Sequence, residues 1–479
     1  MLQPSNNQSP IATAPAYVVL LVLCCALFLN SRNYSIFYAL FASILFGASW
    51  MLAGEKKMSS DRITMFIFLL TLSFLFSFYS LLQINKKNIL PSTIETTGKV
   101  LINRQWGKSK AILIKTKCGK LVAYTHGSLA PEEGSRVVVR GALFDFKGAG
   151  QNKKKFDENL FWRSKGAIKK IVILELAEIS PPSGVYRWRN YLREIIKDKL
   201  PTNLSAYMLA LTVGEKDKAL SEIHRKVGTS HLLAVSGFHI GLLALISTLF
   251  LRRGKKKIIG TTLLIWGAVL LTGLPPGAVR AALMLQIFLI GLLLGKPKNA
   301  FNSVAIAGIL MLLFNPWSFY DISWRLSMLA TIFLSSVINV KWFNLSRICI
   351  PSILVWFVTA PLVSISFQEV PLAGTLINII AVPLFAILFP IIILVSIPLL
   401  IDLPFAKVLA APAECVLEAW NIFSNIFAKV FPWSIISTLP LIFTSVFIIV
   451  TATAFASGMS PKKSLFIGVI LASTFLLLI

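Results

Sequence analysis

Long apolar runs constrain this chain more than any other feature of its sequence. Runs of about 18 apolar residues recur along the 479 residues, and each can cross the hydrocarbon layer of a bilayer as a helix. Hydrophobic residues make up 56% of the chain and charged residues 14%, and the mean hydropathy is +0.75. A soluble protein of this size could not bury so much apolar surface. We therefore expect a polytopic α-helical membrane protein.

The apolar runs fall into two groups on either side of a polar region. Residues 1–85 hold the first group, and its first run, 16–30, is expected to stay in place, because no basic residue precedes it and no cleavage site follows. Segment 405–431 carries several charges, so it either lies in the membrane interface or lines a polar interior. The other candidate spans are 36–53, 63–84, 230–251, 258–274, 278–295, 300–315, 322–340, 348–366, 376–400, 439–457 and 463–479.

Residues 86–180 differ in character and predict a small soluble domain. Five short runs carry β-branched or alternating apolar residues between Gly, Pro, Ser or charged residues, which is typical of strands. They favour a small β-barrel of OB type, with a sandwich fragment as the alternative. Residues 181–228 follow as an amphipathic helical connector, at the membrane surface or against the soluble domain. Residues 229–479 form the second membrane domain.

Five short basic loops indicate the orientation. If the chain starts in the cytoplasm and every candidate span crosses, 405–431 included, all five fall on the cytoplasmic side, as the positive-inside rule requires. We therefore expect a multi-pass protein of the cytoplasmic (inner) membrane with a cytoplasmic N-terminus and an extracytoplasmic β domain. The basic loops are residues 54–62, 252–257, 295–298, 341–347 and 460–463.

The β domain is strongly basic, although orientation does not require it to be. The whole chain has a net charge of +27, and residues 86–180 contain nineteen Lys or Arg against eight Asp or Glu. An ordinary basic surface or contact with anionic lipid headgroups would explain this excess. A nucleic-acid surface would explain it too, because phosphates need cations and unpaired bases stack on aromatic rings. The candidate DNA-binding residues are Lys153, Lys154, Lys155, Phe156, Phe161, Trp162, Arg163, Lys165, Lys169 and Lys170.

The stretch "GTSHLLAVSGFHIGLL", residues 228–243, concentrates polar groups in an apolar segment. A metal site fits poorly, because the two histidines are eight residues apart with no acidic ligand nearby. A Ser–His hydrolase pair lacks the usual G-x-S-x-G turn and an orienting carboxylate. Helix packing through a G-x-x-x-G pair and a polar conduit remain as the stronger interpretations. The residues concerned are His231, Ser236, Gly237, His239 and Gly241.

Further polar groups lie within or beside later apolar runs, and each is costly inside a bilayer. Arg280 and Gln286 share one run; Arg280 stands at a helix start, so snorkelling to the outer headgroups is an alternative to a buried role. Asp321 and Arg325 are four residues apart and are expected to neutralise each other on one helix face. Glu369 follows a further run. Together these groups favour a polar path through the membrane domain.

Four blocks of the sequence follow one another with characteristic order and spacing: "LTVGEKDKALSEIHRKVGTSHLLAVSGFHIGLL", "LLTGLPPGAVRAALML", "NPWSFYDISWRLSMLAT" and "VPLAGTLINIIAVPL". They resemble the signature blocks of the ComEC competence family. The soluble domain, ending in "FDENLFWRSKGAIKKI", is similar to the OB-type domain of that family. The resemblance covers roughly residues 30–400. By position it extends to the histidine stretch, to Arg280, and to Asp321, Arg325 and Ser327.

The resemblance implies transport of one strand of incoming DNA across the cytoplasmic membrane during natural transformation. Many members of the family carry a metallo-β-lactamase-like domain, whereas this sequence has no H-x-H-x-D-H motif and only four histidines, too few for that two-metal site. It has no G-x-x-x-x-G-K-[ST] loop for ATP either. We therefore expect a short form of the family that is not an enzyme and needs no cofactor.

The sequence thus predicts a membrane channel subunit that passes single-stranded DNA. Its expected partners are single-stranded DNA, the lipid bilayer, a separate nuclease, and a cytoplasmic helicase or strand-binding protein. Three alternatives stay open: a transporter of another anionic or lipidic cargo, an intramembrane hydrolase that uses Ser236 and His239, and a scaffold without transport.

Overall fold

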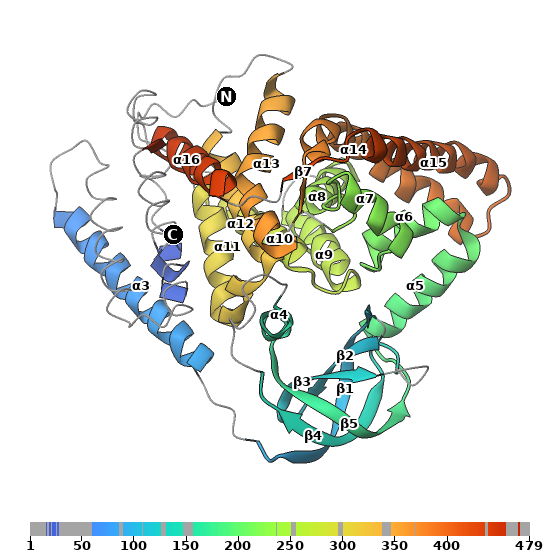
Figure 1. The fold of residues 1–479 in the computed structure, drawn as a ribbon, viewed down its shortest axis with the longest axis horizontal. Coiled ribbons are helices and arrows are strands. Elements are labelled where there is room, and N and C mark those ends of the chain that lie inside the picture. Colours follow the sequence, from blue (N-terminus) through green and yellow to red (C-terminus); the bar gives the residue numbers. More distant parts are fainter. Residues whose placement is uncertain are drawn as a thin grey trace.

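The computed structural model shows a mostly helical protein with one closed β-barrel (Figure 1). In Figure 1 the barrel lies below the helices, and α4 (Glu158–Ser164) and α5 (Val185–Lys199) lie between the two parts. The structure describes residues 60–85, 90–107, 109–125, 131–146, 157–235, 237–250, 255–295, 300–337, 346–367, 369–435 and 439–456, with single positions between 16 and 27 and residues 468–469.

The five strands expected from the sequence are confirmed, and they close into a barrel in the order β1-β2-β3-β5-β4. All neighbours are antiparallel except β3 and β5, which are parallel. Gly141 is required on β4, since a Cβ there would lie 2.2 Å from the carbonyl oxygen of Val172 on β5. The strands are β1 (Thr93–Trp106), β2 (Ser109–Thr116), β3 (Gly119–Thr125), β4 (Arg136–Phe144) and β5 (Ala167–Ser180).

The barrel has two hydrophobic clusters because both faces of its central strands are covered. Alternate residues of β2, such as Ile112 and Ile114, point into the barrel core. Their neighbours pack outward against the short helix α4 (Glu158–Ser164), which lies between β4 and β5 in the chain. Asp157 caps α4 by accepting a hydrogen bond from the backbone N–H of Leu160 at 3.0 Å.

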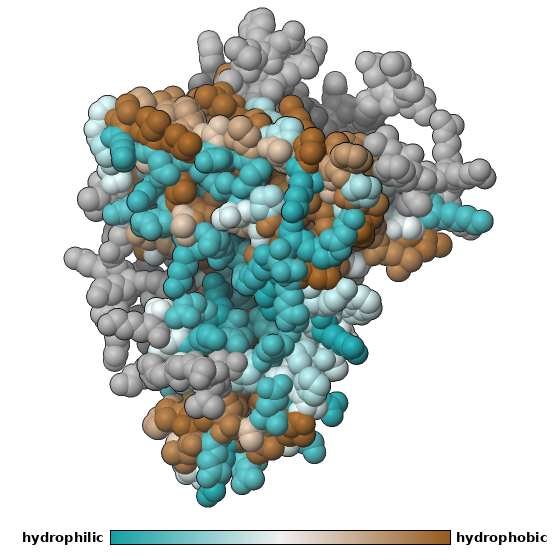
Figure 2. Space-filling view, turned by 90° about the vertical axis from the view of Figure 1, so that its right-hand side faces the viewer, coloured by the Kyte–Doolittle hydropathy of each residue, from teal (hydrophilic) through white to brown (hydrophobic). Residues whose placement is uncertain are grey.

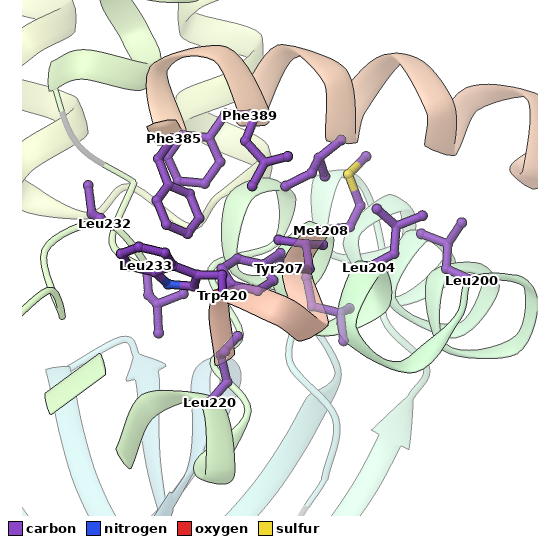
Figure 3. Close-up of a cluster of buried hydrophobic side chains, with 14 of the residues drawn as sticks. Leu200, Leu204, Tyr207, Met208, Leu220, Leu232, Leu233, Phe385, Phe389 and Trp420 are labelled. Carbon is purple, nitrogen blue, oxygen red and sulfur yellow. The ribbon is translucent and has the colours of Figure 1, made fainter. Parts of the chain in front are cut away.

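The connector contains three helices: α5 (Val185–Lys199), α6 (Thr202–Thr212) and α7 (Lys218–Lys226). Helix α5 contacts the barrel through Arg189 and Asn190, which is one of the two positions that the sequence allows. Helix α6 instead enters the largest core of the helical domain, where Tyr207 packs against Phe385 and Trp420 lies against the same ring (Figure 3). Phe385 belongs to α14 (Ala373–Leu400) and Trp420 to α15 (Ala406–Val430). The connector therefore belongs structurally to both parts of the molecule.

The remaining helices form a bundle above the barrel (Figure 1). Among the described residues, two helices, α10 and α14, are both long and apolar enough to cross a membrane. The bundle consists of α3 (Ser60–Asn85), α8 (Gly237–Phe250), α9 (Lys255–Leu271), α10 (Pro276–Leu293), α11 (Ala300–Phe314), the 3-10 turn η1 (Pro316–Tyr320), α12 (Ile322–Val337), α13 (Ser346–Phe367) and α16 (Leu439–Ala456).

Two short strands interrupt the helical domain. Strand β6 (Val370–Pro371), between α13 and α14, pairs with β7 (Ser434–Ile435), between α15 and α16. The backbone N–H of Leu372 also donates to the carbonyl of Trp433 at 3.1 Å. Helices α14 and α15 pack on each other as a hairpin, and this pairing fastens its two ends together. Segment 405–431 is therefore a single helix that returns the chain to the point where α14 began.

Candidate functional site

A cavity of about 1650 Å³ lies inside the helical domain. Its walls come from the C-terminal end of α7, the loop that precedes α8, and helices α8 and α10 to α14, while residues 431–434 close it beside β6. Most of the lining side chains are apolar. The basic ones are Arg225, Lys226, His231 and Arg280.

The histidine stretch meets this cavity at a break in helical structure. His231 lies in a turn, and α8 begins only at Gly237, so the helix predicted from residue 230 starts later than expected. His231 is exposed and lines the cavity. Ser236 lies outside the described residues. His231 and His239 therefore lie on different elements, the turn and α8.

The two glycines of the G-x-x-x-G pair have different surroundings. A Cβ on Gly237 would lie 3.4 Å from the Cβ of Ala281, so Gly237 does bring α8 close to α10. A Cβ on Gly241 would meet nothing within 4 Å, and this residue faces the cavity. Helix packing explains Gly237 and not Gly241.

His239 turns away from the cavity. It is buried on α8, with its ring centroid 4.6 Å from that of Phe389 on α14 and 5.7 Å from that of Phe238. Gln286 is half-buried on α10 and is not among the residues that line the cavity. Among the described residues, no three His, Cys, Asp or Glu side chains lie close enough together to hold a metal ion.

Arg280 is buried at the cavity wall and does not snorkel to the surface. Its Nη1 donates to the carbonyl of Ser327 and to the hydroxyl of Thr331, which lie one turn apart on α12. These acceptors fix the guanidinium between α10 and α12, where it borders the cavity. A cation is thereby held in a wall that is mostly apolar.

Asp321 forms an ion pair that the sequence does not predict. Its carboxylate, 4% exposed, accepts from Lys165 Nζ at 2.9 Å, from the Ser164 hydroxyl at 3.4 Å and from the Ser323 backbone N–H at 2.8 Å. Burial alone would raise the pKa of Asp321, but Lys165 and Ser323 outweigh burial and hold the pKa below its usual range. The barrel domain thus supplies the counter-ion of a carboxylate in the helical domain.

The expected neutralisation of Asp321 by Arg325 is accordingly wrong. Arg325 donates from Nε to the carbonyl of Phe319 at 2.6 Å, and its guanidinium lies over the rings of Phe319 and Tyr320, at 4.9 and 5.6 Å. Spacing along a helix brought the two side chains near each other, but each found better-placed partners elsewhere. Neither residue lines the cavity.

Helix α4 docks on η1 around this ion pair. The Arg163 guanidinium lies 4.6 Å from the ring centre of Trp317, and the Asn315 side-chain amide donates to the carbonyl of Ser164 at 2.7 Å. These contacts join the barrel and the bundle through polar groups that are already paired. The end of the barrel that carries α4 therefore faces the helical domain.

This docking corrects the candidate DNA-binding surface. Trp162 on α4 is fully buried against the barrel strands, so its ring offers no face to a base. Lys169 pairs with Asp145 at 3.2 Å and Lys170 with Glu158 at 3.1 Å. Lys165 and Arg163 are used in the docking contacts above. Of the rest, Phe161 is half-buried, and Lys153, Lys154, Lys155 and Phe156 lie outside the described residues.

Glu369 stands at the edge of the cavity. Its carboxylate is 3.9 Å from Arg225 Nη1, and both side chains are about two-thirds exposed, at 64% and 66%. An ion pair so exposed contributes little stability. Arg225 and Lys226 were missed from the sequence, although the basic run at the end of α7, directly before the histidine stretch, was a usable signal.

His224 was also missed by the sequence analysis. Its side chain supports the start of the loop that precedes α8. It is fully buried, with Nε2 2.8 Å from the Tyr207 hydroxyl and Nδ1 2.8 Å from the Thr229 hydroxyl. Burial lowers the pKa of His224 to about 4, so its ring is neutral at pH 7. A neutral ring can accept on one nitrogen and donate on the other, which links α6 to the start of the loop.

Comparison with known proteins identifies the region that encloses the cavity. The model of the family described as Competence protein matches residues 211–460, just over half of the chain. The chain belongs to the Competence protein family. The resemblance seen in the signature blocks is thereby confirmed.

Two relatives show how far the sequences of similar proteins have diverged from this one. ComE operon protein 3 of Bacillus subtilis (strain 168) is 26% identical over 268 residues, which cover 53% of this chain and 33% of that protein. An uncharacterized protein of Aquifex aeolicus (strain VF5) is 29% identical over 204 residues, 41% of this chain and 49% of that protein. The match thus spans a third to a half of the length of these relatives. No solved structure matches the chain.

The Asp321–Lys165 pair predicts an asymmetric response to substitution. Lys165→Met leaves a buried carboxylate without its cation and should destabilise the protein by about 3–5 kcal/mol, whereas Lys165→Met with Asp321→Asn should recover most of this loss. Lys169→Met is the matched control, because its partner Asp145 is 82% exposed and stays hydrated. Thermal unfolding of the purified protein measures the series. Equal losses in the single and double variants would contradict the prediction.

His224 predicts a specific pH dependence of stability. Its folded-state pKa of about 4 lies below the unfolded value near 6.5. Its contribution to stability is therefore complete above pH 6.5 and is lost as the pH falls toward 4, by about 3 kcal/mol, because only the unfolded state takes up the proton. Unfolding temperatures between pH 7 and pH 4 should fall less steeply in His224→Asn than in the unaltered protein. Parallel curves would exclude this assignment.

Proposed function

We propose that this competence protein is a conduit for single-stranded DNA across the cytoplasmic membrane, acting in DNA uptake. The observation that carries the proposal is the cavity of about 1650 Å³ lined by the family-matched region, with Arg280 held in its wall. Each nucleotide brings one negative charge, and a cation fixed by two acceptors lowers the cost of taking that charge into an apolar bundle.

The composition of the wall suits a nucleic-acid strand. Phe238, Phe431 and Trp433 line the cavity and offer aromatic surface to bases, while Arg225 and Lys226 lie at the end that borders the histidine stretch. Bases stack on aromatic rings with little regard to sequence, which a carrier of arbitrary DNA requires. The non-helical backbone before α8 would be compatible with a position inside a bilayer, because it borders the cavity and not lipid.

The directions of the helices support a polytopic membrane protein with the barrel outside. Helix α3 runs toward β1, α11 ends and α12 begins at η1 beside α4, and Gly273 at the end of α9 lies against Arg189 of α5. The barrel-facing ends therefore alternate with the ends that lead to basic loops, as the positive-inside rule requires. Because β6 and β7 fasten the ends of the α14–α15 hairpin together, this alternation continues into α16.

We assign the barrel to the OB type and give it the role of receiving the strand. The ligand face of such barrels includes the β1–β2 and β4–β5 connections. Here these connections carry Trp106 and Phe161, whose ring centroids are 5.3 Å apart, at the end that docks on the bundle. The chain would act without catalysis and without a cofactor, with a separate nuclease and a cytoplasmic helicase or strand-binding protein as partners.

A lipidic anion is the second candidate cargo, because most of the cavity wall is apolar. An intramembrane hydrolase has less support. His239 faces Phe389 and not the cavity, so it is poorly placed to act on a substrate held there.

Import of DNA tests the proposal. In a transformable strain that depends on this chain, deletion should abolish the nuclease-resistant internal pool of labelled DNA while surface-bound DNA persists. Arg280→Ala at normal protein level should lower import about tenfold, since losing this cation raises the barrier by at least about 1.4 kcal/mol. Arg280→Lys should keep part of the activity, and Arg140→Ala, on the outer surface of the barrel, should keep all of it. An internal pool unchanged by deletion would refute the conduit and favour another cargo.

A further inference from the structure

A hydrophilic, hollowed surface separates the two apolar ends of the molecule (Figure 2). It lies between the barrel and the helices above it. Strand β1, the turn before β4 and helix α5 form a junction between the barrel and the connector, held by several contacts. The backbone N–H of Asn103 donates to Glu133 Oε1 at 3.2 Å, Arg189 Nη1 lies 3.1 Å from Glu133 Oε2, and the Asn190 amide donates to Glu132 Oε2 at 2.9 Å.

The second side of the junction is the turn between α6 and α7. Glu215 in this turn is bound by Arg193 and by Lys197, the latter at 2.7 Å, and both cations belong to α5. Helix α5 therefore fastens β1 on one side and the turn on the other. Its cations also neutralise the carboxylates of the junction, Glu133 and Glu215.

Two further cations stand next to the residues that form these contacts. Arg104 follows Asn103 on β1, and Lys216 follows Glu215 in the turn; both are exposed, and among the described residues neither forms an ion pair within 4 Å. Arg193 on α5 contacts both Glu133, which accepts from Asn103, and Glu215, so the residues that precede Arg104 and Lys216 are held through one side chain. Partial desolvation in the junction and then the charge of Arg104 lower the pKa of Lys216. Glu133 offsets Arg104 in part, but it is already bound by two arginines.

Aromatic rings lie beside one of these cations. The Arg104 guanidinium is 5.8 Å from the ring centre of Trp106 and 5.7 Å from that of Phe161, and Lys165 approaches Phe161 at 5.3 Å. Both rings are half-buried. Paired cations beside partly exposed rings are the combination that binds single strands, by phosphate contact and base stacking.

We propose that Arg104 and Lys216 form a clamp for the phosphodiester backbone of a single strand as it passes from the barrel to the helical domain. The proposal rests on the proposed function and names where the strand is first held. The clamp joins two domains, since Arg104 comes from the barrel and Lys216 from the connector. From Lys216, helix α7 leads over roughly 13 Å to Arg225 and Lys226 at the cavity.

Salt-dependent binding of an oligonucleotide tests the clamp. The full chain in nanodiscs of zwitterionic lipid would be titrated with labelled oligothymidylate at several salt concentrations. Each lost phosphate contact should lower the slope of log affinity against log salt by about 0.7, and should cost about fivefold in affinity at 0.1 M salt. Arg104→Ala and Lys216→Ala should each show this loss, and the double variant should lose up to twice the slope.

Lys117→Ala is the matched control, an exposed cation in the β2–β3 turn at the opposite end of β2 from Trp106. It should leave the slope unchanged. Equal losses in all variants would mean a diffuse basic surface and would overturn the clamp. Unchanged slopes in the Arg104 and Lys216 variants would overturn it too, and would leave lipid headgroups as the counter-ions of this pair.

Import of DNA in the same variants separates the clamp from the conduit. Reduced slopes together with reduced import support both. Reduced slopes with normal import keep the clamp as a binding site and contradict the conduit as its destination. If import depends on Arg280 but the salt slopes are unchanged in the Arg104 and Lys216 variants, the conduit is supported and the clamp is refuted.

Discussion

The buried carboxylate of Asp321 imposes the arrangement of the two domains. A charge 4% exposed in a helical bundle needs a cation and hydrogen-bond donors, and removing either is costly. Lys165 and Ser164 provide them from the barrel, 156 and 157 residues away in sequence. Because both residues belong to the end of α4, satisfying Asp321 sets which end of the barrel meets the bundle. That end carries Trp106, Phe161 and, on β1, Arg104.

The cavity depends on the places where helices are interrupted. The turn before α8, strand β6 and strand β7 all contribute to its wall. Close backbone approach holds these pieces together: a Cβ on Gly228 would lie 2.9 Å from Cα of Gly374, and Gly228 has a φ of +74° that favours glycine. Broken helices that meet at a cavity are the usual way in which membrane proteins bring backbone polar groups to a cargo. Under the proposed function, the signature stretch is one such break, and His224 supports it through Thr229.

Local patterns predicted local structure well and long-range pairing poorly. Alternating apolar residues located all five barrel strands, and apolar runs located most helices. The break before Gly237 was missed, because a continuous apolar run gives no sign of where a helix begins. Helical spacing paired Asp321 with Arg325, whereas the fold pairs it with Lys165, a contact that no spacing rule can reveal. Trp162 stands among lysines in the sequence, which suggested base stacking. The seven-residue helix α4 instead buries one of its faces, and Trp162 lies on that buried face. His231, Gly237, Gly241, Arg280 and Glu369 do border the cavity.

Photo-crosslinking to a strand stalled during import would test the central claim that DNA passes through this cavity. A photoreactive residue would replace Trp433, 63% exposed at the cavity, and in a separate variant Leu270, 44% exposed on α9 and not part of the cavity wall. DNA blocked at one end by a bulky group would hold the strand in transit. The account predicts crosslinks at position 433 and none above background at 270. Continued import with no crosslink at 433, or with equal crosslinks at both positions, would contradict it.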